Sequence, residues 1–141
     1  MSEPLLDAAQ LQGILAAAFP GAEIPLVEEV RSEGVTLALP VGPHHVRPGG
    51  TLAGPAMMML ADTAAWCAVM ARVGPVVLAV TTSLHIDFLR RPALDDVIAR
   101  TRMLKLGRRL AVVAVEITTR ATGELVAHAQ VTYSLPPRDP S

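Results

Sequence analysis

Apolar residues recur at helical spacing near the N-terminus and again in a longer run at the middle of the chain. The first run, residues 7–19, starts at Asp7, whose pairing with Gln10 three positions later is typical of a helix N-cap, and stops at Pro20. The second run, residues 55–72, starts at a proline, which suits the first turn of a helix, and stops before a Gly-Pro pair. It is apolar on every side, so we expect a buried central helix.

Strand patterns occupy most of the remaining sequence. Residues 27–31 and 35–39 flank a short Ser-Glu-Gly turn, and a stretch rich in glycine and proline at 42–50 predicts a loop. Beyond the central helix, turn residues separate four further strands, at 76–89, 97–106, 110–120 and 124–135. The last strand alternates apolar and polar residues, which predicts that one of its faces lies on a core.

One buried helix followed by a meander of long antiparallel strands predicts an α+β fold. The simplest architecture is a curved antiparallel β-sheet wrapped around one long central helix, with a short helix at the N-terminus. The 141 residues suit a single domain spanning residues 1–141, and we expect residues 136–141 to form a frayed tail.

The composition narrows the range of partners. With 51% apolar residues and a mean hydropathy of +0.42, the chain is unusually hydrophobic for one small domain, so we expect an oligomer interface. The net charge of −1 gives no indication of nucleic-acid binding. Asp62 and Arg72 interrupt the only long apolar run, so we expect no membrane span. The single Cys67 and an N-terminal segment without basic residues favour a cytoplasmic protein.

Asp62 is the most informative polar residue, because it lies in the middle of the apolar helix pattern. An unpaired buried carboxylate costs several kcal/mol, so Asp62 must be paired, hydrogen-bonded or functional. The plainer alternative is that Asp62 caps a shorter helix that begins at Thr63.

Gly54 precedes the proline at the start of the central helix. The N-terminus of a helix offers backbone N–H donors and a positive dipole end, which suit a carbonyl oxygen that gains negative charge. The plainer alternative here is an ordinary Gly-Pro helix start.

Other polar groups gather on the predicted strands and turns. Thr81 and Thr82 lie on the strand after the central helix, where threonine is also simply a good strand former. Arg90 and Arg108 lie near turns and suit nucleotide phosphates, although such residues are usually solvated. The histidines lack metal-ligand spacing, and no phosphate-binding loop, dinucleotide fingerprint or nucleophile elbow is present, so we expect neither a metal nor a cofactor.

Several of these segments together resemble the phenylacetate-degradation (PaaI-type) thioesterases of the hotdog superfamily. The resemblance extends over roughly residues 25–136 and is carried by residues 49–55, 60–64, 79–90, 105–109 and 127–133. The spacing of the glycine, the aspartate and the threonine strand is fairly specific to this superfamily. The resemblance implies the hotdog fold, in which the sheet wraps the helix, and an acyl-CoA or aryl-CoA thioester as the substrate.

By residue, the resemblance places the oxyanion glycine on Gly54, the catalytic carboxylate on Asp62 and the water-positioning hydroxyl on Thr81. The substrate-binding positions that we expect are Arg47, Ala53, Pro55, Met58, Thr82, Arg90 and Arg108. Asp62 would either attack the thioester carbonyl or deprotonate a water molecule, and the sequence leaves both routes open.

The spacing along the central helix predicts that the active site is shared between two chains. Asp62 lies eight residues beyond Gly54, which is about 12 Å along a helix axis. One thioester carbon cannot lie near both groups of one helix, whereas two antiparallel helices across a two-fold axis would bring them together. This agrees with the resemblance, and we expect a homodimer or a dimer of dimers.

Two departures from the family pattern keep a rival interpretation open. Most members carry histidine where this chain has Ala53, and an asparagine is often found at the position of Arg47. The chain could therefore be a non-catalytic acyl-CoA-binding or regulatory hotdog module. A hydratase would need a histidine on or just before the helix, where the sequence has none, and a structural subunit would leave Asp62 unexplained.

Overall fold

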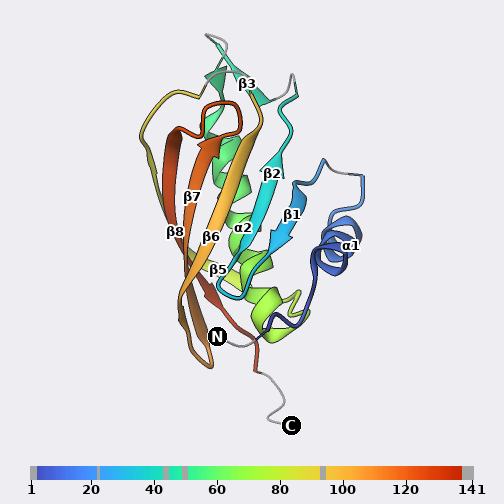
Figure 1. Cartoon of the computed structure of the whole chain (residues 1–141). Coiled ribbons are helices and arrows are strands. Elements are labelled where there is room, and N and C mark those ends of the chain that lie inside the picture. Colours follow the sequence, from blue (N-terminus) through green and yellow to red (C-terminus); the bar gives the residue numbers. More distant parts are fainter. Residues whose placement is uncertain (1–2, 22, 43–44, 49–50, 93–94, 138–141) are drawn as a thin grey trace.

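The computed structural model describes residues 3–21, 23–42, 45–48, 51–92 and 95–137. The chain forms helices α1 (Ala8–Ala18) and α2 (Gly54–Val73) and strands β1 (Leu26–Val30), β2 (Val35–Leu39), β3 (Val46–Arg47), β4 (Thr51–Leu52), β5 (Val80–Phe88), β6 (Val97–Leu106), β7 (Leu110–Thr119) and β8 (Leu125–Ser134). Six strands form one antiparallel sheet in the order β1-β2-β6-β7-β8-β5. The sheet curves around α2, and α1 lies beside β1 (Figure 1). The predicted α+β architecture is confirmed.

The N-terminal helix begins where its capping residues predict. The Asp7 side chain accepts a hydrogen bond from the Gln10 N–H at 2.8 Å, and the Gln10 side chain accepts one from the Asp7 N–H at 2.9 Å. Each side chain thus satisfies a backbone donor that the first helical turn leaves without a partner. Leu11 and Leu15 then anchor the helix in the core.

Helix α2 is the centre of the core, as its apolar pattern predicts. Its buried residues pack on the concave face of the sheet, and Gly74 ends it with a positive φ of 97°. By length and composition alone, α2 would be able to cross a membrane, and 67% of its most apolar window is buried inside the fold. The expectation of burial on every side is wrong for Met58 and Met59, which lie on an exposed stripe of α2.

The neighbour order of the strands differs from a simple meander. Strands β6, β7 and β8 are consecutive neighbours, but β5 pairs with β8 at the far edge of the sheet and does not pair with β6. The alternation of apolar and polar residues tells which face of a strand is buried, and it leaves the choice of neighbouring strand undetermined.

Two local predictions of strand and loop are wrong. Residues 76–79, predicted as strand, form a turn in which the Val76 N–H donates to Gly74 O and the Ala79 N–H donates to Val76 O. These local hydrogen bonds occupy backbone N–H and C=O groups that a strand would use to pair with its neighbour, so β5 begins only at Val80. Part of the predicted loop at 42–50 forms β3, which pairs with β4 just beyond the loop as a small two-stranded sheet. Residues 138–141 of the predicted tail lie outside the described part of the chain.

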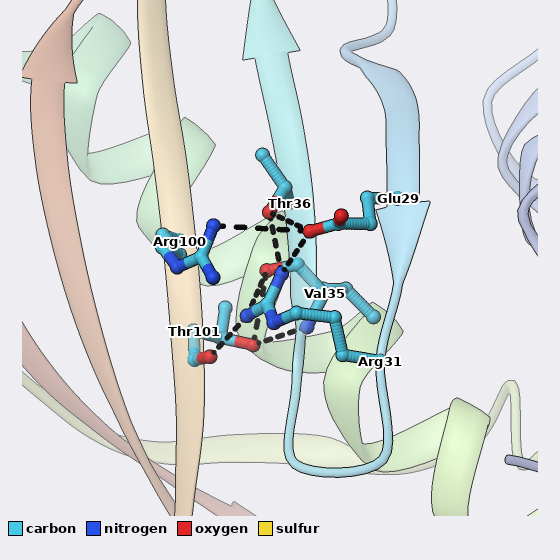
Figure 2. Close-up of polar contacts among 6 residues, drawn as sticks. All are labelled: Glu29, Arg31, Val35, Thr36, Arg100 and Thr101. Carbon is cyan, nitrogen blue, oxygen red and sulfur yellow. Dashed lines mark hydrogen bonds and ion pairs between the residues drawn. The ribbon is translucent and has the colours of Figure 1, made fainter. Parts of the chain in front are cut away.

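A polar cluster fixes the turn between β1 and β2 against β6 (Figure 2). The Arg31 guanidinium donates to Glu29 Oε1 at 2.9 Å, to Thr36 Oγ1 at 2.6 Å and to Thr101 O at 2.9 Å. The hydrogen bond from Arg31 is the main cause that lowers the pKa of the Glu29 carboxyl. Gly34 approaches this site so closely that a Cβ atom would lie 2.0 Å from Thr101 O.

Candidate functional site

Two side-chain hydroxyls of the sheet lie within hydrogen-bond distance of the Asp62 carboxylate. The Thr81 hydroxyl donates to Asp62 Oδ1 at 2.6 Å, and the Tyr133 hydroxyl lies 2.8 Å from the same oxygen and 3.0 Å from the Asp62 carbonyl oxygen. Helix α2 runs without a break through Asp62, so the alternative of a shorter helix capped by Asp62 is wrong. The carboxylate is half-buried and hydrogen-bonded, which satisfies the requirement that a charged group inside an apolar helix has partners.

The two hydroxyls are neighbours because of the register of β5 and β8. Thr81 lies directly opposite Tyr133, and the register then shifts before Ser83, which leaves Thr82 as the extra residue of a β-bulge. The Thr82 side chain is exposed and donates to Thr132 O at 3.3 Å. Of the two adjacent threonines, the structure therefore brings Thr81 to Asp62 and directs Thr82 away from it.

Tyr133 was not predicted as a site residue. It is only 4% exposed, and burial is the main cause that raises the pKa of its phenol well above the usual range. The signal in the sequence is that the only tyrosine of the chain lies on the apolar face of the last strand. A buried tyrosine needs a partner for its hydroxyl, and a buried carboxylate is the obvious one.

A hollow of about 330 Å³ opens beside the carboxylate. The end of α1 supplies one wall, α2 supplies a second, and the segment before and within β5 supplies a third; the lining residues are Ala18, Phe19, Asp62, Thr63, Trp66, Val77, Ala79, Thr81 and Tyr133. The Phe19 and Trp66 rings meet edge to face, with centroids 5.9 Å apart. A hollow with two aromatic rings, one carboxylate and three hydroxyl side chains at its wall is the arrangement expected of a small-molecule site.

The N-terminal end of α2 forms a second hollow, of about 340 Å³. Gly54 is the first helical residue and Ala53 is the N-cap, one position earlier than the sequence suggested. The Phe88 ring lies over Gly54, since a Cβ atom there would meet it at 3.4 Å. Pro55 and Arg90 line this hollow as well. The Arg90 guanidinium is exposed and donates to Leu125 O at 2.7 Å.

Met58 and Arg108 line neither of these two hollows. Met58 is 41% exposed on α2, and Arg108 is exposed in the turn between β6 and β7. Arg47 lies in β3, and its side chain is outside the described part of the structure, as are Gly49 and Gly50 of the family-like segment.

The chemistry available at Asp62 is that of a carboxylate with hydroxyl partners. Within the described residues, no group of three or more His, Cys, Asp or Glu side chains could hold a metal ion. The Cys67 thiol is buried on α2, and burial raises its pKa to about 12, so it stays protonated and unreactive. Gly54 and Asp62 of one chain are separated by two turns of α2, about 12 Å along its axis, and they line different hollows.

Comparisons with known proteins point to one family. A family model described as the thioesterase superfamily matches residues 49–127. A candidate thioesterase from a Silicibacter species is 35% identical, with 96% of this chain and 95% of that chain covered and a TM-score of 0.84. Zebrafish thioesterase superfamily member 2 is 26% identical, with 93% of this chain and 99% of that chain covered and a TM-score of 0.81. A mutant of the phenylacetic acid degradation protein PaaI from Thermus thermophilus is 28% identical, with 86% and 98% covered and a TM-score of 0.72. Among curated proteins, none matches this chain.

Proposed function

Since the chain belongs to the thioesterase superfamily, we propose that it hydrolyses acyl-CoA or aryl-CoA thioesters to a free acid and CoA. The observation that carries this proposal is the half-buried Asp62 carboxylate, which is hydrogen-bonded to Thr81 and Tyr133 beside a hollow of acyl-group size. Within the superfamily, we infer a PaaI-type enzyme from the segments around Gly54, Asp62 and Thr81. The similarity to the Thermus protein supports this narrower assignment.

In the proposed reaction, Asp62 acts on the carbonyl carbon of the thioester. It either attacks this carbon and forms an anhydride that water then cleaves, or it removes a proton from a water molecule that attacks instead. In both routes the C–S bond breaks, CoA leaves as the thiolate and is protonated, and the acyl group leaves as the carboxylic acid. The carbonyl oxygen gains negative charge on the way, and a backbone N–H donor there contributes on the order of 3 kcal/mol.

We propose that this donor is the N–H of the partner subunit's Gly54. The support is the separation of the two hollows along α2, because a thioester carbon near Asp62 is out of reach of Gly54 in the same chain. A two-fold axis that runs between two antiparallel α2 helices would join the Asp62 hollow of one subunit to the Gly54 hollow of the other.

The exposed surface of the chain suits such a homodimer, or a dimer of dimers. Strand β5 is an edge of the sheet, and Val80 on it is 60% exposed. Met58 and Met59 on α2 are exposed as well. An unpaired edge strand and an apolar helix stripe are both surfaces that a second copy would cover.

Two cationic residues are proposed to bind the phosphates of CoA. Arg108 is exposed at the β6–β7 turn, and Arg90 is exposed beside the Gly54 hollow. In the antiparallel dimer, the partner subunit's Arg90 would approach the end of the molecule that carries Asp62. Exposed guanidinium groups suit a nucleotide phosphate.

The test is thiol release from acetyl-CoA, hexanoyl-CoA and phenylacetyl-CoA by the wild type and by Asp62→Asn. We expect higher kcat/KM for the hexanoyl and phenylacetyl thioesters than for the acetyl thioester, because the Phe19 and Trp66 rings offer a longer or aromatic acyl group an apolar wall within the hollow. The Asp62→Asn variant should fold normally and show no hydrolysis, since the amide keeps the shape and loses the charge. Wild-type kcat in this variant would contradict the mechanism. Tight CoA-thioester binding without turnover by the wild type would instead indicate a non-catalytic binding module.

A further inference from the structure

We propose that Tyr133 is a positioning residue which, together with Thr81, holds Asp62 by one carboxylate oxygen and leaves the other oxygen to act on the substrate. This inference rests on the proposed thioester hydrolysis and adds to it a residue from the last strand of the sheet. It also assigns different roles to the two carboxylate oxygens of Asp62: Oδ1 accepts the hydrogen bonds that hold the side chain, and Oδ2 acts on the substrate or the water molecule.

The hydrogen bonds to Asp62 are unequally distributed. Thr81 and Tyr133 both approach Oδ1, at 2.6 Å and 2.8 Å. Within the described part of the chain, Oδ2 has no hydrogen-bond partner. A carboxylate with one oxygen held by two donors has a fixed orientation, and its second oxygen keeps its lone pairs for a water molecule or an acyl carbon.

The fold explains why Tyr133 reaches the carboxylate. Its position on β8 points toward α2, where Ala129, Val131 and Leu135 of the same segment are also buried. Its hydroxyl lies within reach of both Oδ1 and the Asp62 carbonyl oxygen. The phenol hydroxyl has a single proton to donate, either to Oδ1 or to the carbonyl oxygen. Both acceptors belong to Asp62, so either hydrogen bond keeps the tyrosine ring at the same place beside the helix.

Tyr133 remains a donor throughout the pH range in which thioesters are assayed. Burial is the main cause that raises the pKa of its phenol; the Thr81 hydroxyl lowers this pKa, and the nearby Asp62 charge raises it. The other titratable group close to it is the Cys67 thiol of α2, which is neutral at these pH values. Strand β5 presents only the Thr81 hydroxyl to Asp62, and the end of α1 presents Ala18 and Phe19. A hydrogen bond to a carboxylate favours its charged form.

The first test is Tyr133→Phe, which keeps the ring and removes only the hydroxyl. We expect kcat to fall by about 10-fold to 100-fold, with KM changed less than about 3-fold, because the lost bond orients the reacting group. The acidic limb of the pH–rate profile should move to higher pH, since the carboxylate loses a donor. The matched control is Thr132→Val, the preceding residue on the other face of β8, which should change neither quantity. An unchanged kcat and an unchanged limb in Tyr133→Phe would overturn the inference.

A second substitution covers the case in which Tyr133→Phe fails to fold. Tyr133 is the only tyrosine of the chain, so growth on 3-fluorotyrosine alters this phenol alone. The more acidic phenol is a stronger donor, so the acidic limb should move to lower pH, in the direction opposite to Tyr133→Phe. If Tyr133 served only to pack the core, the two changes would not shift the acidic limb in opposite directions. An acidic limb at the same pH in all three proteins would refute the positioning role of Tyr133.

A measurement without substrate separates this inference from the proposed function. Carbon-13 labelling of the aspartate carboxyls, with Asp62→Asn to identify the signal, gives the titration midpoint of the Asp62 carboxyl by NMR. The midpoint should rise in Tyr133→Phe and fall with 3-fluorotyrosine. If the wild type hydrolyses no thioester, the proposed function fails while these shifts still show whether Tyr133 holds Asp62. Midpoints that stay constant would sink the positioning role alone.

Discussion

Thr81 and Thr82 are adjacent residues of one type that the β5 bulge places in opposite environments. Thr81 donates its hydroxyl proton to Asp62 Oδ1, and Thr82 donates its own to the carbonyl of Thr132. Because Thr81 donates to the carboxylate, its hydroxyl is available to a water molecule only as an acceptor. The expected water-positioning role therefore extends to holding Asp62, and the pair offers a matched experiment.

Thr81→Ala should lower kcat for the best thioester by about 10-fold to 100-fold, because it removes one of the two donors that orient Asp62. Thr82→Ala, one residue along the same strand, should stay within about 2-fold of the wild type. Both variants are compared by steady-state thiol release, after thermal unfolding has shown that each is folded. A loss confined to Thr82→Ala would contradict the register of β5 and β8.

At this scale the sequence predicted part of the candidate site. Asp62 was conspicuous because a carboxylate interrupts an apolar helix, and Thr81 belonged to a hydroxyl cluster on the next strand. Tyr133 was not predicted, because the alternation of apolar and polar residues shows only which face of a strand is buried. It does not show which strand residue lies level with a given position of the helix. That level depends on the β5–β8 pairing, which joins residues about fifty positions apart.

At the scale of elements, the position of the β1–β2 turn depends on a close backbone approach. Gly34 lies against the Thr101 carbonyl of β6, and the Arg31 guanidinium bridges the same carbonyl to Glu29 on β1. The sequence predicted this turn and both its strands, since local turn chemistry and short apolar runs define them. It could not predict that the turn packs against β6, which is a long-range contact.

Gly34→Ala should destabilise the protein by about 3 kcal/mol or more, because the new methyl group would overlap the Thr101 backbone. The matched control is Gly13→Ala in α1, where the added methyl meets nothing within 4 Å apart from its chain neighbours and the backbone of its own helix. Replacing a glycine inside a helix with alanine should stabilise by about 0.5 to 1 kcal/mol. Urea unfolding monitored by circular dichroism compares the two, and equal effects would show that Gly34 is not tightly packed.

At the scale of the whole molecule, one chain carries two unlike hollows at different points of α2. One contains Asp62 and Thr81, and the other contains Gly54 and the Phe88 ring. The exposed Met58 and Met59 lie on α2 between them in sequence. The fold class and the central helix were predictable from periodicity, and the separation of Gly54 from Asp62 from their spacing. The residues that line each hollow follow only from the structure.

Complementation between two inactive variants tests whether these halves join across a dimer. Asp62→Asn removes the carboxylate, and Gly54→Val places a side chain at the proposed oxyanion position. The Cβ of the valine would meet the Phe88 ring at 3.4 Å, an ordinary contact, so the variant should fold. Each variant alone should be inactive in thioester hydrolysis.

When the two variants are unfolded together and refolded as a mixture, about half of the dimers should be mixed. A shared site gives each mixed dimer one site with both substitutions and one with neither. Roughly a quarter of all sites are then intact, and activity should return to about that fraction of the wild type. If both groups came from one chain, every site would carry a lesion and the mixture would stay inactive. Mass spectrometry of the intact dimers is the control, because an inactive mixture that contains mixed dimers would exclude the shared site. Asp62 would then need an oxyanion donor from its own chain, and the rise of about 12 Å along α2 rules out Gly54 for that task.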